Sequence, residues 1–72
     1  MSAISKAVKI IGGQSKLAKI VGTTQTAISN WVNRHQQTPA KYIRTVSALT
    51  NNEVTVEQLL ADHEKNQNQE KG

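Results

Sequence analysis

Apolar residues recur along this chain at the three- and four-residue spacing of a helix that buries one face. The pattern predicts helices over about residues 3–11, 14–21, 24–33, 39–50 and 56–62. Val54 and Val56 alternate around Thr55, so a short extended piece over 54–56 is also compatible with the pattern. We therefore predict an all-α fold, a compact five-helix bundle of modest size.

The predicted helix boundaries coincide with residues that start or stop helices. The expected N-terminal signals are Ser2, Thr23 or Thr24, the pair Thr38 and Pro39, and a capping box formed by Thr55 and Gln58. The expected stops are Gly12-Gly13, Gly22 and Asn51-Asn52. The buried line of the fourth helix is expected to be Tyr42 or Ile43, then Val46 and Leu49. From His63 onward no residue is apolar, so we expect residues 63–72 to form a disordered tail beside a domain of residues 1–62.

The stretch from Gln14 to Asn33, QSKLAKIVGTTQTAISNWVN, holds two short amphipathic helices separated by Gly22. Glycine adopts the left-handed conformation that ends a helix at little cost, so the turn here is tight. Helices joined by so short a turn cross at a steep angle, as in a helix-turn-helix unit. Such a unit places its second helix in the major groove of DNA.

Charge is divided unevenly along the sequence. Residues 1–52 carry seven Lys or Arg and no acid, whereas residues 53–72 carry five acids and two lysines. A field of one sign over the predicted helix-turn-helix attracts phosphates and speeds encounter with DNA. The sequence has two aromatic residues, too few for recognition of single-stranded nucleic acid by stacking. No cysteine is present and no apolar run could span a bilayer, so we expect a cytoplasmic protein without membrane contact.

The second helix of the pair carries uncharged polar side chains beside its apolar stripe. Those predicted to read base edges are Gln25, Thr26, Ser29 and Asn30, which share one flank of the helix. Amide side chains can pair with adenine through two hydrogen bonds, and hydroxyl groups can contact several bases. A solvated polar face remains the alternative for any one of them. The residues predicted to contact the DNA backbone are Gln14, Lys16, Thr24, Asn33, Arg34 and Lys41.

The sequence resembles a known family. The residues Gln14, Ala18, Gly22, Ile28 and Trp31 match recurring positions of the helix-turn-helix in phage Cro and repressor proteins. The stretch GGQSKLAKIVGTTQTAISNW, followed by TPAKYIRTVSALTNNEVTVEQL, is most similar to the YdaS-type Cro-like proteins of bacterial prophages. The chain departs from the family pattern at Thr23, where a branched apolar residue is usual, and at the Asn33-Arg34 step after the second helix.

The resemblance implies a lambda-repressor-like domain that binds an operator in double-stranded DNA as a homodimer and regulates transcription in the nucleoid of a bacterial host. The pairing surface is expected around Val54, Val56, Leu59 and Leu60, unless these residues pack in the core. A toxin–antitoxin component, a transcriptional activator and a protein-interaction module are the alternatives. An enzyme is not expected, and neither is a cofactor, a metal or a small-molecule substrate, because His35 and His63 lie in a predicted loop and tail and no carboxylate lies in residues 1–52.

Overall fold

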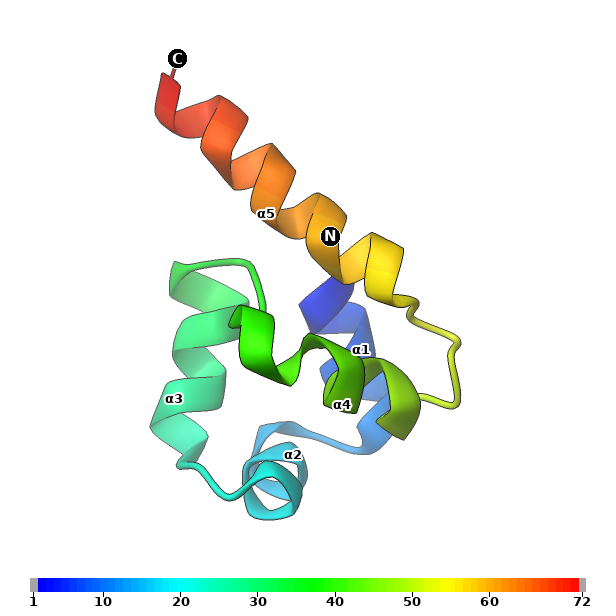
Figure 1. The fold of residues 1–72 in the computed structure, drawn as a ribbon. Helices are drawn as coiled ribbons and strands as arrows, with labels where there is room; N and C mark the ends of the chain where they lie inside the picture. The colour runs from blue at the N-terminus through cyan, green and yellow to red at the C-terminus, as the bar shows by residue number, and fades with distance from the viewer. Residues whose placement is uncertain (1, 72) are drawn as a thin grey trace.

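The chain folds into helices connected by short turns. The computed structural model describes the backbone of residues 2–71 and the side chains of residues 2–65. The elements are α1 (Ala3–Ile11), α2 (Gln14–Val21), α3 (Gln25–Ser29), a π-helix η1 (Asn30–Arg34), a 3-10 helix η2 (Ala40–Tyr42), α4 (Ile43–Leu49) and α5 (Val56–Lys71). The five predicted α-helices are therefore present (Figure 1). No strand occurs within residues 2–71, and Val56 opens α5 instead of an extended piece.

The first two helices begin and end at the predicted residues. The Ser2 hydroxyl caps α1 by accepting from the amide of Ser5, and Gly12 ends the helix with a φ of 116°. Gly22 ends α2 in the left-handed conformation, with a φ of 78°. Of the two threonines that could cap the next helix, Thr24 does so, because its Oγ1 accepts from the amide of Ala27 at 3.1 Å.

The helix predicted over 24–33 changes its geometry halfway. It is α-helical to Ser29 and continues as the π-helix η1 to Arg34. The wider turns are closed by bonds between residues five apart, such as that from the His35 amide to the Asn30 carbonyl at 2.8 Å. A π turn rotates the side chains that follow it, but here it occupies the last five residues of the helix, too few to alter the apolar spacing that the sequence shows.

The prediction that Thr38 caps the fourth helix and Pro39 opens it is wrong. Pro39, with a ψ of 140°, precedes the helix instead of opening it, and the first turn is the 3-10 helix η2 from Ala40. The Thr38 side chain is fully buried and does not cap; its Oγ1 has no hydrogen-bond partner among the described residues. The Thr38 carbonyl instead accepts from Nε2 of His63 at 2.5 Å, which holds this segment against α5. The segment that precedes η2 is thus positioned by a contact with α5, which lies far away in the sequence.

Side chains from every α-helix meet in one core. Trp31 of η1 lies against Tyr42 of η2, with ring centroids 5.1 Å apart. In the predicted line of α4, Ile43 and Val46 are buried and Leu49 is partly buried. The buried hydrophobic residues are Ile4, Ala7, Val8, Ile11, Leu17, Ala18, Ile28, Trp31, Ile43, Val46, Val54 and Leu59.

The surface expected to pair two copies is therefore mostly interior. Val54 and Leu59 are fully buried, and Val56 packs partly against the core. These residues fill the space between α5 and the rest of the domain, because α5 needs an apolar face to dock. Of the four residues expected there, only Leu60 is exposed, with 46% of its surface accessible.

Helix α5 begins as predicted and ends later than predicted. Thr55 and Gln58 form the expected capping box, with reciprocal bonds of 3.0 and 3.1 Å. The backbone is helical to Lys71, beyond the helix end expected near residue 62 (Figure 1). Glu, Gln and Lys are good helix formers and no Gly or Pro interrupts them, so a helix once nucleated continues. Gly72 and the side chains of 66–71 lie outside the described part of the chain, and a domain boundary at residue 62 stays a prediction.

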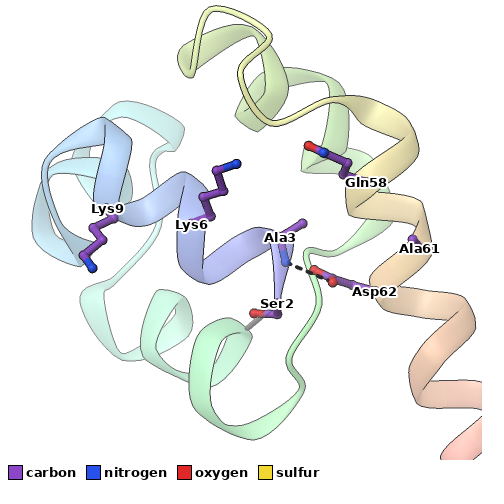
Figure 2. Close-up of a pocket in the computed structure, with 7 residues that line it drawn as sticks. All are labelled: Ser2, Ala3, Lys6, Lys9, Gln58, Ala61 and Asp62. Carbon is purple, nitrogen blue, oxygen red and sulfur yellow. Dashed lines mark hydrogen bonds between the residues drawn. The ribbon is translucent and has the colours of Figure 1, made fainter.

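A long-range contact joins the start of α1 to α5. The carboxylate of Asp62 is buried and accepts from the amides of Ala3 at 3.0 Å and Ile4 at 3.2 Å (Figure 2). The first amides of a helix have no partner within the helix, and a negative charge there is favoured by the helix dipole. Asp62 therefore supplies hydrogen-bond acceptors to the first amides of α1, and the same bonds hold α5 against this end of the helix.

Candidate nucleic-acid interface

A polar hollow lies where α2 meets α3. Its volume is about 260 Å³, and it is lined by Gln14, Gln25, Thr26, Ser29 and Asn30. Four of these are the side chains predicted to read bases, and the fifth, Gln14, comes from the first turn of α2. The structure thus brings together at one surface two groups of residues that the sequence places eleven or more positions apart.

The geometry of the hollow follows from the packing beneath it. In Figure 1, α2 is seen nearly end-on while α3 runs lengthwise, so the two helices cross steeply. Leu17 and Ala18 of α2 are buried, as are Ile28 of α3 and Trp31 of η1, and these apolar side chains hold the two helices together. The polar residues of α3 lie on the flank of the helix opposite these buried side chains.

Two hydrogen bonds organise the polar side chains around the hollow. The Ser15 hydroxyl lies 3.4 Å from Oε1 of Gln25, to which it donates. The amide Nδ2 of Asn33 donates to Oγ of Ser29 at 3.1 Å. Each bond reduces the rotamers open to one of the predicted base-reading residues, which lowers the entropy cost of ordering it in a complex. Ser15 was not predicted from the sequence, and its place beside Gln14 in the first turn of α2 is the signal that could have indicated it.

The residues predicted to contact phosphates are more dispersed. Gln14 lines the hollow, while Lys16 and Arg34 are exposed, the first on α2 and the second at the end of η1. Thr24 uses its hydroxyl to cap α3, and Asn33 uses its amide on Ser29. The ammonium group of Lys41, on η2, lies 5.1 Å from the centroid of the Tyr42 ring. Apart from Gln14, none of these side chains lines the hollow.

The fold separates the two signs of charge. The seven cationic side chains of residues 1–52 belong to α1, α2, η1, η2 and α4, whereas the described acids lie in α5 or just before it. Of these acids, Asp62 is buried at the start of α1. No acid therefore belongs to the helices that form the hollow, and an anion approaching them meets no carboxylate on α2, α3 or η1.

The described residues offer little for other chemistry. Within them, no group of three or more His, Cys, Asp or Glu is placed to hold a metal ion. None of the helices searched in this part of the chain combines the length and the apolar character needed to cross a membrane.

Two helices that cross at a glycine turn, with a polar hollow along the second, define a helix-turn-helix protein. The chain belongs to the family described as "Bacterial toxin YdaS", which matches residues 4–68. This confirms the family resemblance read from the sequence.

A named relative comes from Escherichia coli (strain K12). It is called "Putative transcriptional regulator YdaS" and is 30% identical to this chain over 57 residues, which is 79% of this chain. The match covers 58% of the relative, so the chain spans less than two thirds of that protein's length. No solved structure matches the chain.

Proposed function

We propose that this chain is a sequence-specific regulator of transcription that binds double-stranded DNA. In this proposal α3 enters the major groove, and Gln25, Thr26, Ser29 and Asn30 contact base edges. The observation that carries the proposal is the hollow, where all four of these side chains lie together with Gln14. Two supports are independent of it: the one-signed charge of residues 1–52, and the name of the relative, which describes a transcriptional regulator.

The proposed mode of regulation is repression of the Cro type. Cationic side chains neutralise phosphates and set the position of the protein on the duplex, and the polar flank of α3 selects the sequence. Two copies bind an operator with their α3 helices about one DNA turn apart, because one helix reads too few base pairs for useful selectivity. A bound dimer then excludes polymerase from an overlapping promoter.

Substitution of a base-reading residue should weaken specific binding selectively. We expect Gln25→Ala or Asn30→Ala to cost about 1–3 kcal/mol at the operator and little on random DNA, because base contacts exist only at the specific site. Fluorescence anisotropy with both duplexes measures the two losses. Thr45→Ala, an exposed polar residue of α4 outside the hollow, is the matched control and should change neither. Equal losses on both DNAs would contradict base reading.

Substitution of a backbone-contacting lysine should act on all sequences alike. We expect Lys16→Ala to weaken operator and random DNA similarly and to reduce the slope of log K against log salt by roughly one unit, because one counterion fewer is released. Lys19→Ala removes another exposed charge from α2 at a position not predicted to touch DNA, and it should leave the slope nearly unchanged. A slope unchanged by Lys16→Ala would exclude Lys16 from the interface.

The family description supports a second candidate, a toxin or toxin–antitoxin component. The regulator and the toxin can be distinguished by asking whether any growth inhibition requires the residues proposed to contact bases. If the protein arrests growth when it is expressed and Gln25→Ala with Asn30→Ala abolishes the arrest, the effect passes through DNA. If the doubly substituted protein remains toxic at equal abundance, another target is responsible, and the toxin candidate is favoured.

A partner-binding role for α3 is not favoured by its surface. Exposed aromatic or aliphatic anchors are typical of protein interfaces, and the exposed large hydrophobic residues described in this chain are Ile10, Ile20 and Leu60, none of them on α3. Neither name found by the comparisons describes an enzyme.

The experiment that tests the proposed function is selection of bound duplexes from a random-sequence library at moderate salt, followed by sequencing. Enrichment of an inverted repeat with half-sites about one helical turn apart supports a dimeric regulator and supplies its operator. Binding without enrichment, lost as salt rises, would leave only electrostatic attachment and would contradict the proposal.

A further inference from the structure

A groove runs between α1 and α5, away from the hollow. Its volume is about 550 Å³, and none of its lining residues lines the hollow. Figure 2 shows Lys6 and Lys9 on the α1 side of the groove and Gln58, Ala61 and Asp62 on the α5 side. Ala3 and Ala61 contribute apolar surface, and two exposed lysines stand along one edge. An occupant that suits this groove presents an apolar side chain next to acidic groups.

Helix α5 itself carries a stripe of that kind. Leu60 is 46% exposed, and Glu57 and Glu64, both exposed, lie three residues before it and four residues after it. Residues at these separations lie one above another on a helix surface, so the leucine is flanked by an acid on each side. This acid–leucine–acid stripe lies next to the side of α5 that faces the groove, which carries Gln58, Ala61 and Asp62.

The stripe and the groove are complementary in both polarity and charge. We propose that two copies of this chain pair by placing the stripe of each copy, with Leu60 at its centre, in the groove between α1 and α5 of the other. Glu57 and Glu64 of one copy then face Lys6 and Lys9 of its partner. Such an interface is two-fold symmetric, because each copy both gives a stripe and receives one.

The pairing also explains why a large apolar side chain is exposed at Leu60. The other exposed large hydrophobic residues described, Ile10 on α1 and Ile20 on α2, lie on helices that carry no acid. Pairing through α1 and α5 leaves the hollow between α2 and α3 uncovered by the interface residues, so both copies could bind DNA at once. The inference rests on the proposed function, in which two copies bind DNA together. Its test measures self-association without DNA, so the two can fail separately.

The first test measures the mass of the protein in solution by sedimentation equilibrium across a wide concentration range without DNA. We expect a monomer–dimer equilibrium that weakens as salt rises. Leu60→Asp should raise the dimer dissociation constant at least about tenfold, because two buried leucines are lost from each dimer. The matched control is Ile20→Asp, an exposed aliphatic residue outside the groove, which should leave the constant unchanged. Circular dichroism verifies that each variant is folded.

The second test exchanges the charges. Lys6→Glu with Lys9→Glu, or Glu57→Lys with Glu64→Lys, should each prevent self-association, because like charges then face each other across the interface. Mixing the two variant proteins should restore a dimer, since every pair in the mixed dimer has opposite charges. A protein that stays monomeric at all concentrations would overturn the inference, as would a dimer unaffected by Leu60→Asp or by the exchanges. Variants of Lys6 and Lys9 that change DNA affinity without changing association would assign these lysines to phosphates instead.

Discussion

Trp31→Ala should lower the free energy of unfolding by about 3–5 kcal/mol, the range measured when a large buried aromatic residue is truncated. Trp31 is only 6% exposed and contacts Tyr42, and it lies in η1, which continues directly from α3. Its removal leaves a cavity between η1 and η2 that the short elements around it cannot close without moving. Chemical denaturation of the variant, followed by circular dichroism at the helix band, gives the change.

Tyr42→Leu is the matched control for this prediction. It removes the contact between the two rings but leaves an apolar side chain in the same place, so the loss should be about 0.5–1.5 kcal/mol, the value typical of an aromatic pair. A Trp31→Ala protein as stable as the parent would show that α3 and η1 do not pack through this residue, and the hollow would then lack its support.

Asp62→Ala should cost about 2–3 kcal/mol of stability. The carboxylate accepts two amide hydrogen bonds in a buried position, and a bond to a charged group contributes about 1.5–3 kcal/mol. Without it, the amides of Ala3 and Ile4 lose their partners at an end of α1 that α5 covers. Thermal and denaturant unfolding of the purified variant measure the loss.

Glu53→Ala provides the comparison for Asp62→Ala, because it removes an exposed acid close to the start of α5 and outside the proposed pairing surface. Its effect on stability should stay within about 0.5 kcal/mol. Asp62→Asn should fall between the two, since the amide oxygen can still accept one bond but carries no charge. Equal effects at positions 62 and 53 would mean that the contact with α1 contributes nothing beyond surface charge.

Local signals were sufficient to predict the part of the fold that forms the hollow. The apolar spacing around Leu17 and Ile28 indicated the buried faces of α2 and α3, and Gly22 with Thr23 or Thr24 indicated the turn between them. Because these signals act within a few residues, they do not depend on the rest of the chain. The gathering of Gln25, Thr26, Ser29 and Asn30 with Gln14 followed from the turn, although their contact with DNA remains a proposal.

The predictions that failed depend on contacts distant in sequence. Thr38 reads as a helix cap, but its segment is held by His63, twenty-five residues later. Val54 and Leu59 are apolar whether they face a partner or the core, and only the position of α5 shows that they face the core. The end of α5 was expected near residue 62, whereas the helix, held on α1 through Asp62, extends to Lys71. The π geometry of η1 leaves no mark in the side-chain pattern.

The bond between Asp62 and the first amides of α1 has a consequence for how the protein is made. It joins residues 59 positions apart, so α1 leaves the ribosome well before α5, the helix that supplies its partner. A nascent chain halted before Asp62 therefore exposes the amides and the apolar face that α5 later covers. Ribosome-bound chains of increasing length should remain sensitive to protease until α5 has cleared the exit tunnel. Once α5 has emerged and can dock on α1, the chains should become resistant.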